Sequence, residues 1–254
     1  MAVNWFALSV ALLGVGLISF MRGAFGGGFA VIGIPLLSLA VDPIAAGALL
    51  APLFVVMDVV ALRYWKPQHW SRADLLPLLP ALVVGIAAGF LLMRVLDRGV
   101  IAISIAVTTL AFAALFFAGG GQVAARPRSI PRALVAGASS GVTTMVAHAG
   151  GPPLALYLLR RGLPKEVYAG TTSLFFTVGN AIKIGPWLTL ARPTSQLWTM
   201  MLLCLPAIPL GVSLGWRLHH RLDQRQLYRI CYGLLVVTAL KLLWDGFSRT
   251  LGHT

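Results

Sequence analysis

The sequence consists largely of apolar blocks, many of them long enough to cross a membrane as a helix. Crossing the hydrocarbon core takes about 20 mostly apolar residues. With 58% hydrophobic and only 11% charged residues, the chain holds more apolar sequence than a soluble core can use. We therefore predict an all-α polytopic membrane protein in the lipid bilayer. The blocks cover residues 4–21, 29–41, 44–62, 75–93, 100–118, 133–147, 154–159, 167–190, 197–218 and 227–244.

Two short blocks, 29–41 and 154–159, each follow a glycine cluster, GAFGGG at 23–28 and HAGGPP at 148–153. Irregular backbone at membrane depth is tolerated only where protein or a water-filled cavity surrounds it. Each cluster is therefore predicted to form the tip of a helical hairpin built from half-helices. Close helix packing is the alternative reason for glycines in a membrane chain.

The order of the blocks recurs in the second part of the chain. This recurrence predicts a first repeat over 1–118, a linker loop over 119–132 and a second repeat over 133–254. Each repeat would hold one glycine-tipped hairpin and three further transmembrane helices. An offset of 123 residues, or 126 after a short insertion, aligns Gly14 with Gly137, Gly27 with Gly150, Gly28 with Gly151, Gly47 with Gly170, Pro80 with Pro206, Gly85 with Gly211, and Gly89 with Gly215.

The basic residues predict how the repeats are oriented. If the glycine clusters are hairpin tips, the repeats are inverted and thirteen basic residues lie on one side against four on the other. If the clusters only interrupt spanning helices, the repeats are parallel and this bias disappears. Cytoplasmic loops are enriched in Lys and Arg, so we predict inverted repeats with both termini periplasmic. The thirteen are Arg63, Lys66, Arg72, Arg126, Arg128, Arg132, Arg160, Arg161, Lys165, Arg217, Arg221, Arg225 and Arg229.

Several other classes of protein are not indicated. The net charge of +13 lies in clusters between apolar blocks rather than on one basic face, so no nucleic-acid partner is expected. The first block lacks a basic segment before it and is predicted to be a retained helix rather than a cleaved signal. Cys204 and Cys231 lie in apolar runs with no CxxC spacing and no nearby His, so neither a disulfide framework nor a structural zinc site is expected, and no cofactor is predicted. An enzyme is not expected, since only Thr144 and His148 could pair a nucleophile with a base.

Three segments resemble the sulfite exporter TauE/SafE family, also called the 4-toluene sulfonate uptake permeases. They are GAFGGGFAVIGIPLL from Gly23, HAGGPPLALYLL from His148, and GTTSLFFTVGNAIK from Gly170 to Lys183. The resemblance implies a multi-pass permease of the bacterial inner membrane that moves sulfite, sulfonates or related small organosulfur anions without ATP hydrolysis. It also implies Thr171, in the GT pair, as a substrate contact.

A polar stripe in the block 167–190 is the sharpest candidate site. Ser173, Thr177, Asn180 and Lys183 are spaced by four, three and three residues, which places them on one face of a helix. A charge within an apolar block needs a functional reason, and a cation suits an anionic substrate. The alternative is that Lys183 extends its amine to the membrane interface.

The glycine tips are the second candidate. Ser140, Thr144 and His148 form a stripe that ends at the second cluster, where His148 could donate to an oxyanion or carry a coupling proton. A histidine bonded to a backbone carbonyl is the structural alternative. The short helix after each tip points its N-terminus toward the tip and attracts anions. Substrate contacts are predicted at Gly27, Gly28, Gly150 and Gly151.

Asp58 is the only acidic residue within an otherwise apolar block of the first repeat. It is predicted either to pair with Arg22 or Arg63, or to carry a proton for coupling. Together these residues predict a secondary transporter that moves a small anion by alternating access, with a proton as the candidate coupling ion. An anion-selective, channel-like pore is the alternative, since helix termini and a lysine can also line a pore.

Overall fold

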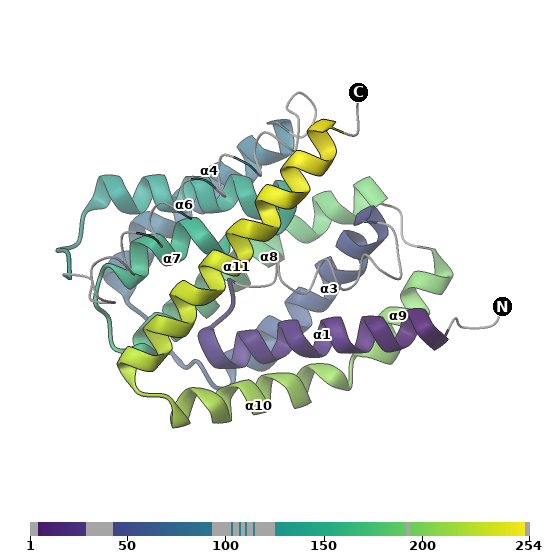
Figure 1. Cartoon of the computed structure of the whole chain (residues 1–254), viewed down its shortest axis with the longest axis horizontal. Coiled ribbons are helices and arrows are strands. Elements are labelled where there is room, and N and C mark those ends of the chain that lie inside the picture. Colours follow the sequence, from purple (N-terminus) through teal and green to yellow (C-terminus); the bar gives the residue numbers. More distant parts are fainter. Residues whose placement is uncertain are drawn as a thin grey trace. The chain divides into compact units, whose positions relative to one another are not determined.

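The computed structural model describes residues 5–28, 43–92, 125–191 and 194–251, together with the single positions 103, 107, 110 and 114. The predicted apolar run 29–41, most of the predicted helix 100–118 and the start of the linker lie outside these residues. The described part of the chain is helical throughout, without a strand. The elements in Figure 1 are α1 (Trp5–Phe25), α3 (Pro43–Leu62), η2 (Pro67–His69), α4 (Arg72–Leu92), α6 (Ile130–Ala147), α7 (Gly151–Leu159), α8 (Lys165–Ala191), α9 (Ser195–Cys204), α10 (Ala207–Arg221) and α11 (Gln224–Leu251).

The described helices match the predicted blocks in type and, within a few residues, at most of their ends. Within the described ranges, three stretches are long and apolar enough to cross a membrane: Trp5–Phe25, Arg72–Leu92 and Ser195–Arg221. A shorter apolar helical stretch covers Leu49–Leu62. The second short block forms α7, which has only nine residues. The all-helical prediction is therefore confirmed for the described residues.

The predicted block 197–218 is the exception, because it forms two helices instead of one. α9 ends at Cys204 and α10 begins at Ala207. Pro206 lies between them and has no backbone N–H with which to continue the helical ladder. Tight turns replace the ladder: the Leu205 N–H donates to the Leu202 carbonyl at 3.2 Å, and the Ile208 N–H donates to the Leu205 carbonyl at 3.1 Å.

The chain divides into two compact units, each assembled from both parts of the sequence. Unit 1 contains residues 1–70 and 169–221, and unit 2 contains residues 71–168 and 222–254. Unit 1 therefore holds α1, α3, α9, α10 and most of α8, whereas unit 2 holds α4, α6, α7 and α11. Each predicted repeat thus contributes helices to both units.

In unit 1, α1 packs along α10 (Figure 1), and glycines lie at the contact between them. A Cβ atom added at Gly23 would lie 2.0 Å from the Val212 carbonyl oxygen, and one at Gly215 would lie 2.0 Å from the Phe20 oxygen. A Cβ at Gly211 would lie 2.7 Å from the Gly16 oxygen. These glycines let the two backbones approach directly, as small residues do in membrane helix pairs.

In unit 2, α4 packs along α6 in the same manner (Figure 1). A Cβ at Gly85 would lie 2.1 Å from the Ala138 carbonyl oxygen, and one at Gly137 would lie 2.6 Å from the Leu78 oxygen. At Gly89 the nearest atoms lie at 3.0 Å. Both units are therefore built around a glycine-mediated helix pair.

A buried carboxylate ties one end of unit 2 together. Asp74, at the start of α4, accepts hydrogen bonds from Ser71 Oγ at 2.7 Å, Tyr157 Oη at 2.7 Å and Arg161 Nε at 3.1 Å. The end of α7 is thus fixed to the start of α4. The Arg126 N–H donates to the Arg160 carbonyl at 2.7 Å, so the chain just before α6 meets the chain just after α7.

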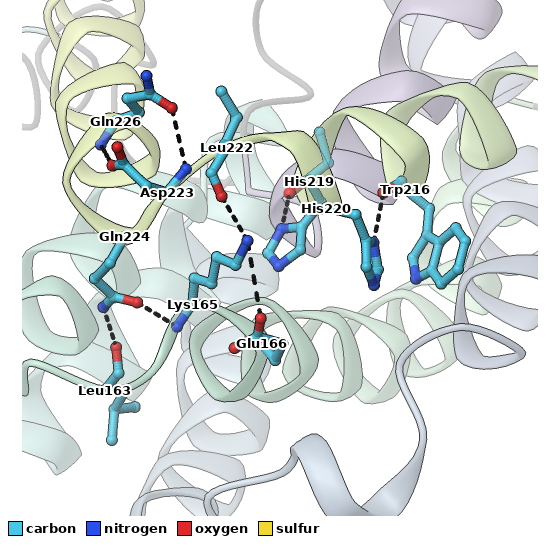
Figure 2. Close-up of polar contacts among 11 residues, drawn as sticks. Leu163, Lys165, Glu166, Trp216, His219, His220, Leu222, Asp223, Gln224 and Gln226 are labelled. Carbon is cyan, nitrogen blue, oxygen red and sulfur yellow. Dashed lines mark hydrogen bonds and ion pairs between the residues drawn. The ribbon is translucent and has the colours of Figure 1, made fainter.

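The turn before α8 is held by the start of α11, as Figure 2 shows. The Lys165 N–H donates to Gln224 Oε1 at 2.7 Å, and Gln224 Nε2 donates to the Leu163 carbonyl at 2.6 Å. Lys165 Nζ donates to the Leu222 carbonyl. Together with the Arg126–Arg160 contact, these bonds gather the basic segments 126–128, 160–165 and 222–225 at one end of unit 2.

The outer faces of several helices are strongly apolar. Leu13 on α1 is 66% exposed, Leu76 on α4 is 76% exposed, and Leu210 on α10 is 64% exposed. Soluble monomers rarely expose large contiguous apolar patches. Such side chains fit helices whose outer faces contact lipid.

Candidate functional site

The predicted site residues fall into both units. Seven of them belong to unit 1: Gly27, Gly28, Asp58, Thr171, Thr177, Asn180 and Lys183. The other four, Thr144, His148, Gly150 and Gly151, belong to unit 2.

Asp58 is the centre of the polar group in unit 1, and its side chain is fully buried. One carboxylate oxygen forms an ion pair with Arg22 Nη1 from α1, which is the first of the two pairings considered from the sequence. The other oxygen accepts a hydrogen bond from Asn180 Nδ2 at 2.7 Å. Asp58 therefore joins α1, α3 and α8 through hydrogen-bonding groups that are buried from water.

Arg22 and Lys183 both lie against the same aromatic ring. The Arg22 guanidinium carbon and Lys183 Nζ are each 5.0 Å from the centre of the Phe54 ring. A cation over an aromatic face is attracted by the ring quadrupole, most strongly when water is excluded. Arg22 is 4% exposed and Lys183 is 2% exposed, so water is largely excluded from both. We call Arg22, Phe54, Asp58, Asn180 and Lys183 the cation cluster.

Arg22 retains hydrogen-bonding capacity beyond its ion pair. A guanidinium carries five N–H donors. Within the part of the chain that the structure describes, the buried Nε of Arg22 has no hydrogen-bond partner. Buried donors are nearly always satisfied in proteins, so an exception needs an explanation such as a ligand or a water molecule.

The polar stripe of α8 enters the cation cluster through its last two members. Asn180 and Lys183 are buried within the cluster. Earlier along the helix, Thr171 is also buried, and the half-buried Thr177 donates its hydroxyl to the Ser173 carbonyl at 2.8 Å. Thr177 therefore keeps only acceptor capacity for a ligand.

The glycine cluster at the end of α1 turns the chain beside Arg22. Gly26, Gly27 and Gly28 all have positive φ angles, of 76°, 108° and 88°, a backbone region that is costly for residues with a Cβ. A Cβ at Gly26 would lie 1.9 Å from the Ala169 oxygen, so this glycine packs against α8. A Cβ at Gly27 would meet Arg22 Nη1 at 3.6 Å. Gly27 therefore lies beside the guanidinium.

Two aromatic residues hold the last carbonyls of α1. Trp65 Nε1 donates to the Arg22 carbonyl at 3.2 Å. The Nδ1 atom of the buried His219, from α10, lies 2.7 Å from the Ala24 carbonyl oxygen (Figure 2). Because a carbonyl oxygen can only accept a hydrogen bond, Nδ1 must carry the proton. Trp65 and His219 also pack edge to face, with ring centres 4.8 Å apart. The backbone that carries Arg22 is thereby fixed.

In unit 2 the second glycine cluster joins α6 to α7. His148 ends α6 with a left-handed conformation, φ 53°, which is uncommon outside glycine and often marks functional sites. Ser140 Oγ donates to the Gly150 carbonyl at 2.6 Å, and a Cβ at Gly150 would lie 2.8 Å from Thr144 Cβ. Gly150 therefore lets this turn pack closely on α6, while Gly151 begins α7.

Sequence reasoning did not assign four of the residues that form or support the site: Arg22, Phe54, Trp65 and His219. Arg22 carried a signal, since it is a charge next to an apolar block. Nothing distinguishes Phe54 from the other phenylalanines in the sequence. Among the described residues, no group of three or more His, Cys, Asp or Glu side chains is placed to hold a metal ion.

Comparison with protein families yields one match that spans nearly the whole chain. The sulfite exporter TauE/SafE family matches residues 10–242, a range that includes the cation cluster and both glycine clusters. Comparison with curated proteins and with solved structures finds no significant match. It is a family of membrane transporters, and the apolar helices described above agree with a multi-pass membrane protein. On the extent of this match, the chain belongs to the sulfite exporter TauE/SafE family.

Proposed function

We propose that the protein is a secondary transporter that moves a small oxyanion, such as sulfite or a sulfonate, across the bacterial inner membrane by alternating access. The observation that carries this proposal is the cation cluster, where Arg22, Asn180 and Lys183 gather within apolar helices. Burying charges in a membrane protein is expensive and commonly marks a substrate pathway. Arginine and lysine are also the side chains best suited to bind oxyanions.

The proposed substrate site in unit 1 consists of the cation cluster with the turn and helix around it. Arg22, Asn180 and Lys183 supply N–H donors to the oxyanion oxygens. Gly27 and Gly28 allow the backbone to pass close to the anion. Thr171 and Thr177 add polar groups along α8.

We propose a further anion contact within unit 2, at the turn between α6 and α7. The hydrogen bond between the Arg126 N–H and the Arg160 carbonyl supports a hairpin in which α6 starts and α7 ends on the same side of the membrane. The nine residues of α7 rise about 13 Å, roughly half of the ~30 Å hydrocarbon thickness, which would place the tip near the midplane. There the N-terminus of α7 at Gly150 and Gly151, with Thr144 and His148, would face the anion.

We further propose that the two repeats are inverted, as the basic residues predict. The glycine packing supports the repeat: Gly85 and Gly89 of α4 face α6 as Gly211 and Gly215 of α10 face α1. The residues opposite Gly85 and Gly211 are Ala138 and Gly16, which correspond within one residue under the offset of 123. The gathering of basic segments at one end of unit 2 supports a single cytoplasmic side.

Inverted repeats predict that both termini are periplasmic. Alkaline phosphatase fused after Thr254 should be active, because it folds only outside the cytoplasm, whereas green fluorescent protein at the same position should be dark. A fusion in the loop at Lys66 is the matched control and should give the opposite pair of signals. A C-terminal fusion that gives the same pair of signals as the fusion at Lys66 would rule out the inverted arrangement.

Transport is tested with purified protein in liposomes that contain unlabelled sulfite. Labelled sulfite should enter by exchange, and the rate should saturate with concentration. We expect Lys183→Ala to reduce the exchange rate at least tenfold, because removal of a charge-assisted hydrogen bond costs about 1.5 to 3 kcal/mol. His148→Ala tests the tip in unit 2 by the same assay.

The matched controls are Lys66→Ala and His220→Ala, which remove the same side chains at exposed positions. Both controls should exchange sulfite like the wild type. Undiminished exchange in Lys183→Ala and His148→Ala would remove the proposed site. Flux that neither saturates nor responds to sulfite on the opposite side would instead indicate an anion-selective pore.

A further inference from the structure

Asp58 occupies the donors that an oxyanion needs. Its two carboxylate oxygens bind Arg22 Nη1 and Asn180 Nδ2, and both of these donors belong to the proposed substrate site. A carboxylate and a sulfite or sulfonate group present similar oxygens to such donors. The buried carboxylate therefore stands where part of the substrate would bind.

An anion that enters beside an ionised Asp58 would place two negative groups on the same donors in a medium that screens charge poorly. When two such groups share a site, one of them is strongly driven to bind a proton. Protonation of Asp58 removes this repulsion and frees Arg22, whose Nε already has no partner among the described residues. The charge of the cluster is then the same before and after binding, since one proton enters with one negative charge.

We propose that Asp58 is the exchangeable counter-ion of Arg22 and the proton carrier of the transporter. This inference rests on the proposed transport function. In the empty state the Asp58 carboxylate binds Arg22. One proton binds to this carboxylate, the ion pair opens, and one monoanion takes its place on Arg22. Release of the anion on the other side returns the proton to solution and restores the ion pair.

The other ionisable groups near Asp58 come from each element packed against it. α3 contacts α1, α9 and α10, whose buried ionisable residues are Arg22, Cys204 and His219. α8 adds Lys183 beside Asn180. His219 is bonded to the Ala24 carbonyl rather than to Asp58. Of these groups, Asp58 is the only carboxylate and shares its donors with the substrate.

The experiment measures sulfite exchange and net sulfite accumulation in proteoliposomes, with empty liposomes subtracted. For one proton per anion, an inward gradient of one pH unit should raise wild-type accumulation about tenfold. Asp58→Asn keeps the shape of the side chain but carries no exchangeable proton. Because Asp58 belongs to the proposed site, the exchange rate of the variant at equal pH serves as its own baseline. Relative to that baseline, the accumulation should no longer rise with the proton gradient. Sulfite itself titrates in this pH range, so the ratio of wild type to variant is the quantity to compare.

Asp74→Asn is the matched control, because Asp74 is a second buried carboxylate paired with an arginine, and it lies in unit 2 outside the proposed site. This variant should keep both exchange and the gradient response. A wild-type gradient response in Asp58→Asn would overturn the inference. The inference would also be overturned if the wild type exchanged sulfite but its accumulation responded to the proton gradient no more than that of Asp58→Asn. A wild type that does not exchange sulfite would instead contradict the proposed function.

A second variant keeps the test decisive if Asp58→Asn does not fold. The pair Arg22→Gln with Asp58→Asn removes both charges together, so no buried charge is left alone. Its folding is checked by a cooperative melting transition. We expect this folded double variant to lose sulfite exchange. If it exchanges sulfite like the wild type, Arg22 does not bind the substrate and the inference is wrong.

Discussion

Arg22→Ala should lower the free energy of unfolding by about 3 to 5 kcal/mol, because it leaves the buried carboxylate of Asp58 without its cation. Asn180 would remain as a donor to Asp58, but an amide does not neutralise a carboxylate. The measurement is the shift of the denaturant concentration at the midpoint of unfolding in detergent, with helical structure as the monitored signal. We also expect this variant to lose sulfite exchange.

A double-mutant cycle separates the ion pair from the rest of the effect. Adding Asp58→Asn to Arg22→Ala removes the negative charge of Asp58, which the single variant leaves buried without a cation. Part of the lost stability should therefore return. Removing both charges of a buried pair is often nearly neutral, whereas removing one is costly. If the double variant were less stable than Arg22→Ala, the contact between Arg22 and Asp58 would not be the source of the loss.

Among the described residues, the sequence predicted most of the helices well because most of the apolar blocks are long and clearly bounded. It also placed Asn180 and Lys183 on one face of a helix, since helical spacing is a local property. It offered Arg22 and Arg63 as partners of Asp58 without choosing between them, and it did not predict the contact of Asp58 with Asn180, which is 122 residues away in the chain. Such pairs depend on how α1, α3 and α8 pack, and no local pattern records that packing.

The glycine clusters illustrate a different limit. A sequence shows that glycine is present, but not whether its missing side chain makes room for a ligand or for another helix. Gly26 packs on α8 and Gly150 packs on α6, whereas Gly27 borders the side chain of Arg22. Neighbouring glycines of one cluster therefore have different surroundings, and only the positions of the atoms around them distinguish these.

The junction of α9 and α10 shows how the same residue can act differently in two contexts. Pro77 and Pro80 lie inside the continuous α4, whereas Pro206 separates two helices. Pro80 is the ninth residue of α4, and Pro186 lies deep inside the continuous α8, so a missing backbone N–H does not by itself decide whether a helix ends at a proline. The predicted correspondence of Pro80 with Pro206 therefore does not extend to the shape of the backbone.

Gly23→Ala should be among the most damaging single-methyl changes in the protein. The added Cβ would lie 2.0 Å from the Val212 carbonyl oxygen and 2.8 Å from the Trp216 nitrogen. Both are backbone atoms, so relief requires α1 and α10 to move apart. We expect a loss of about 3 kcal/mol, at the upper end of typical overpacking costs. Arg22 precedes Gly23 directly, so a shift of α1 should also displace its guanidinium and reduce sulfite exchange.

Gly16→Ala is the matched control, because it makes the same change in the same helix at a position where no described residue outside the adjoining turns of α1 comes within 4 Å of the added Cβ. Alanine stabilises a helix interior by roughly 0.5 to 1 kcal/mol relative to glycine, so this variant should melt at or slightly above the wild-type temperature. The comparison isolates packing from helix propensity, since propensity favours alanine at both positions. Equal melting temperatures for Gly23→Ala and Gly16→Ala would mean that α1 and α10 are not in direct backbone contact at Gly23. That contact would then not hold Arg22 in position.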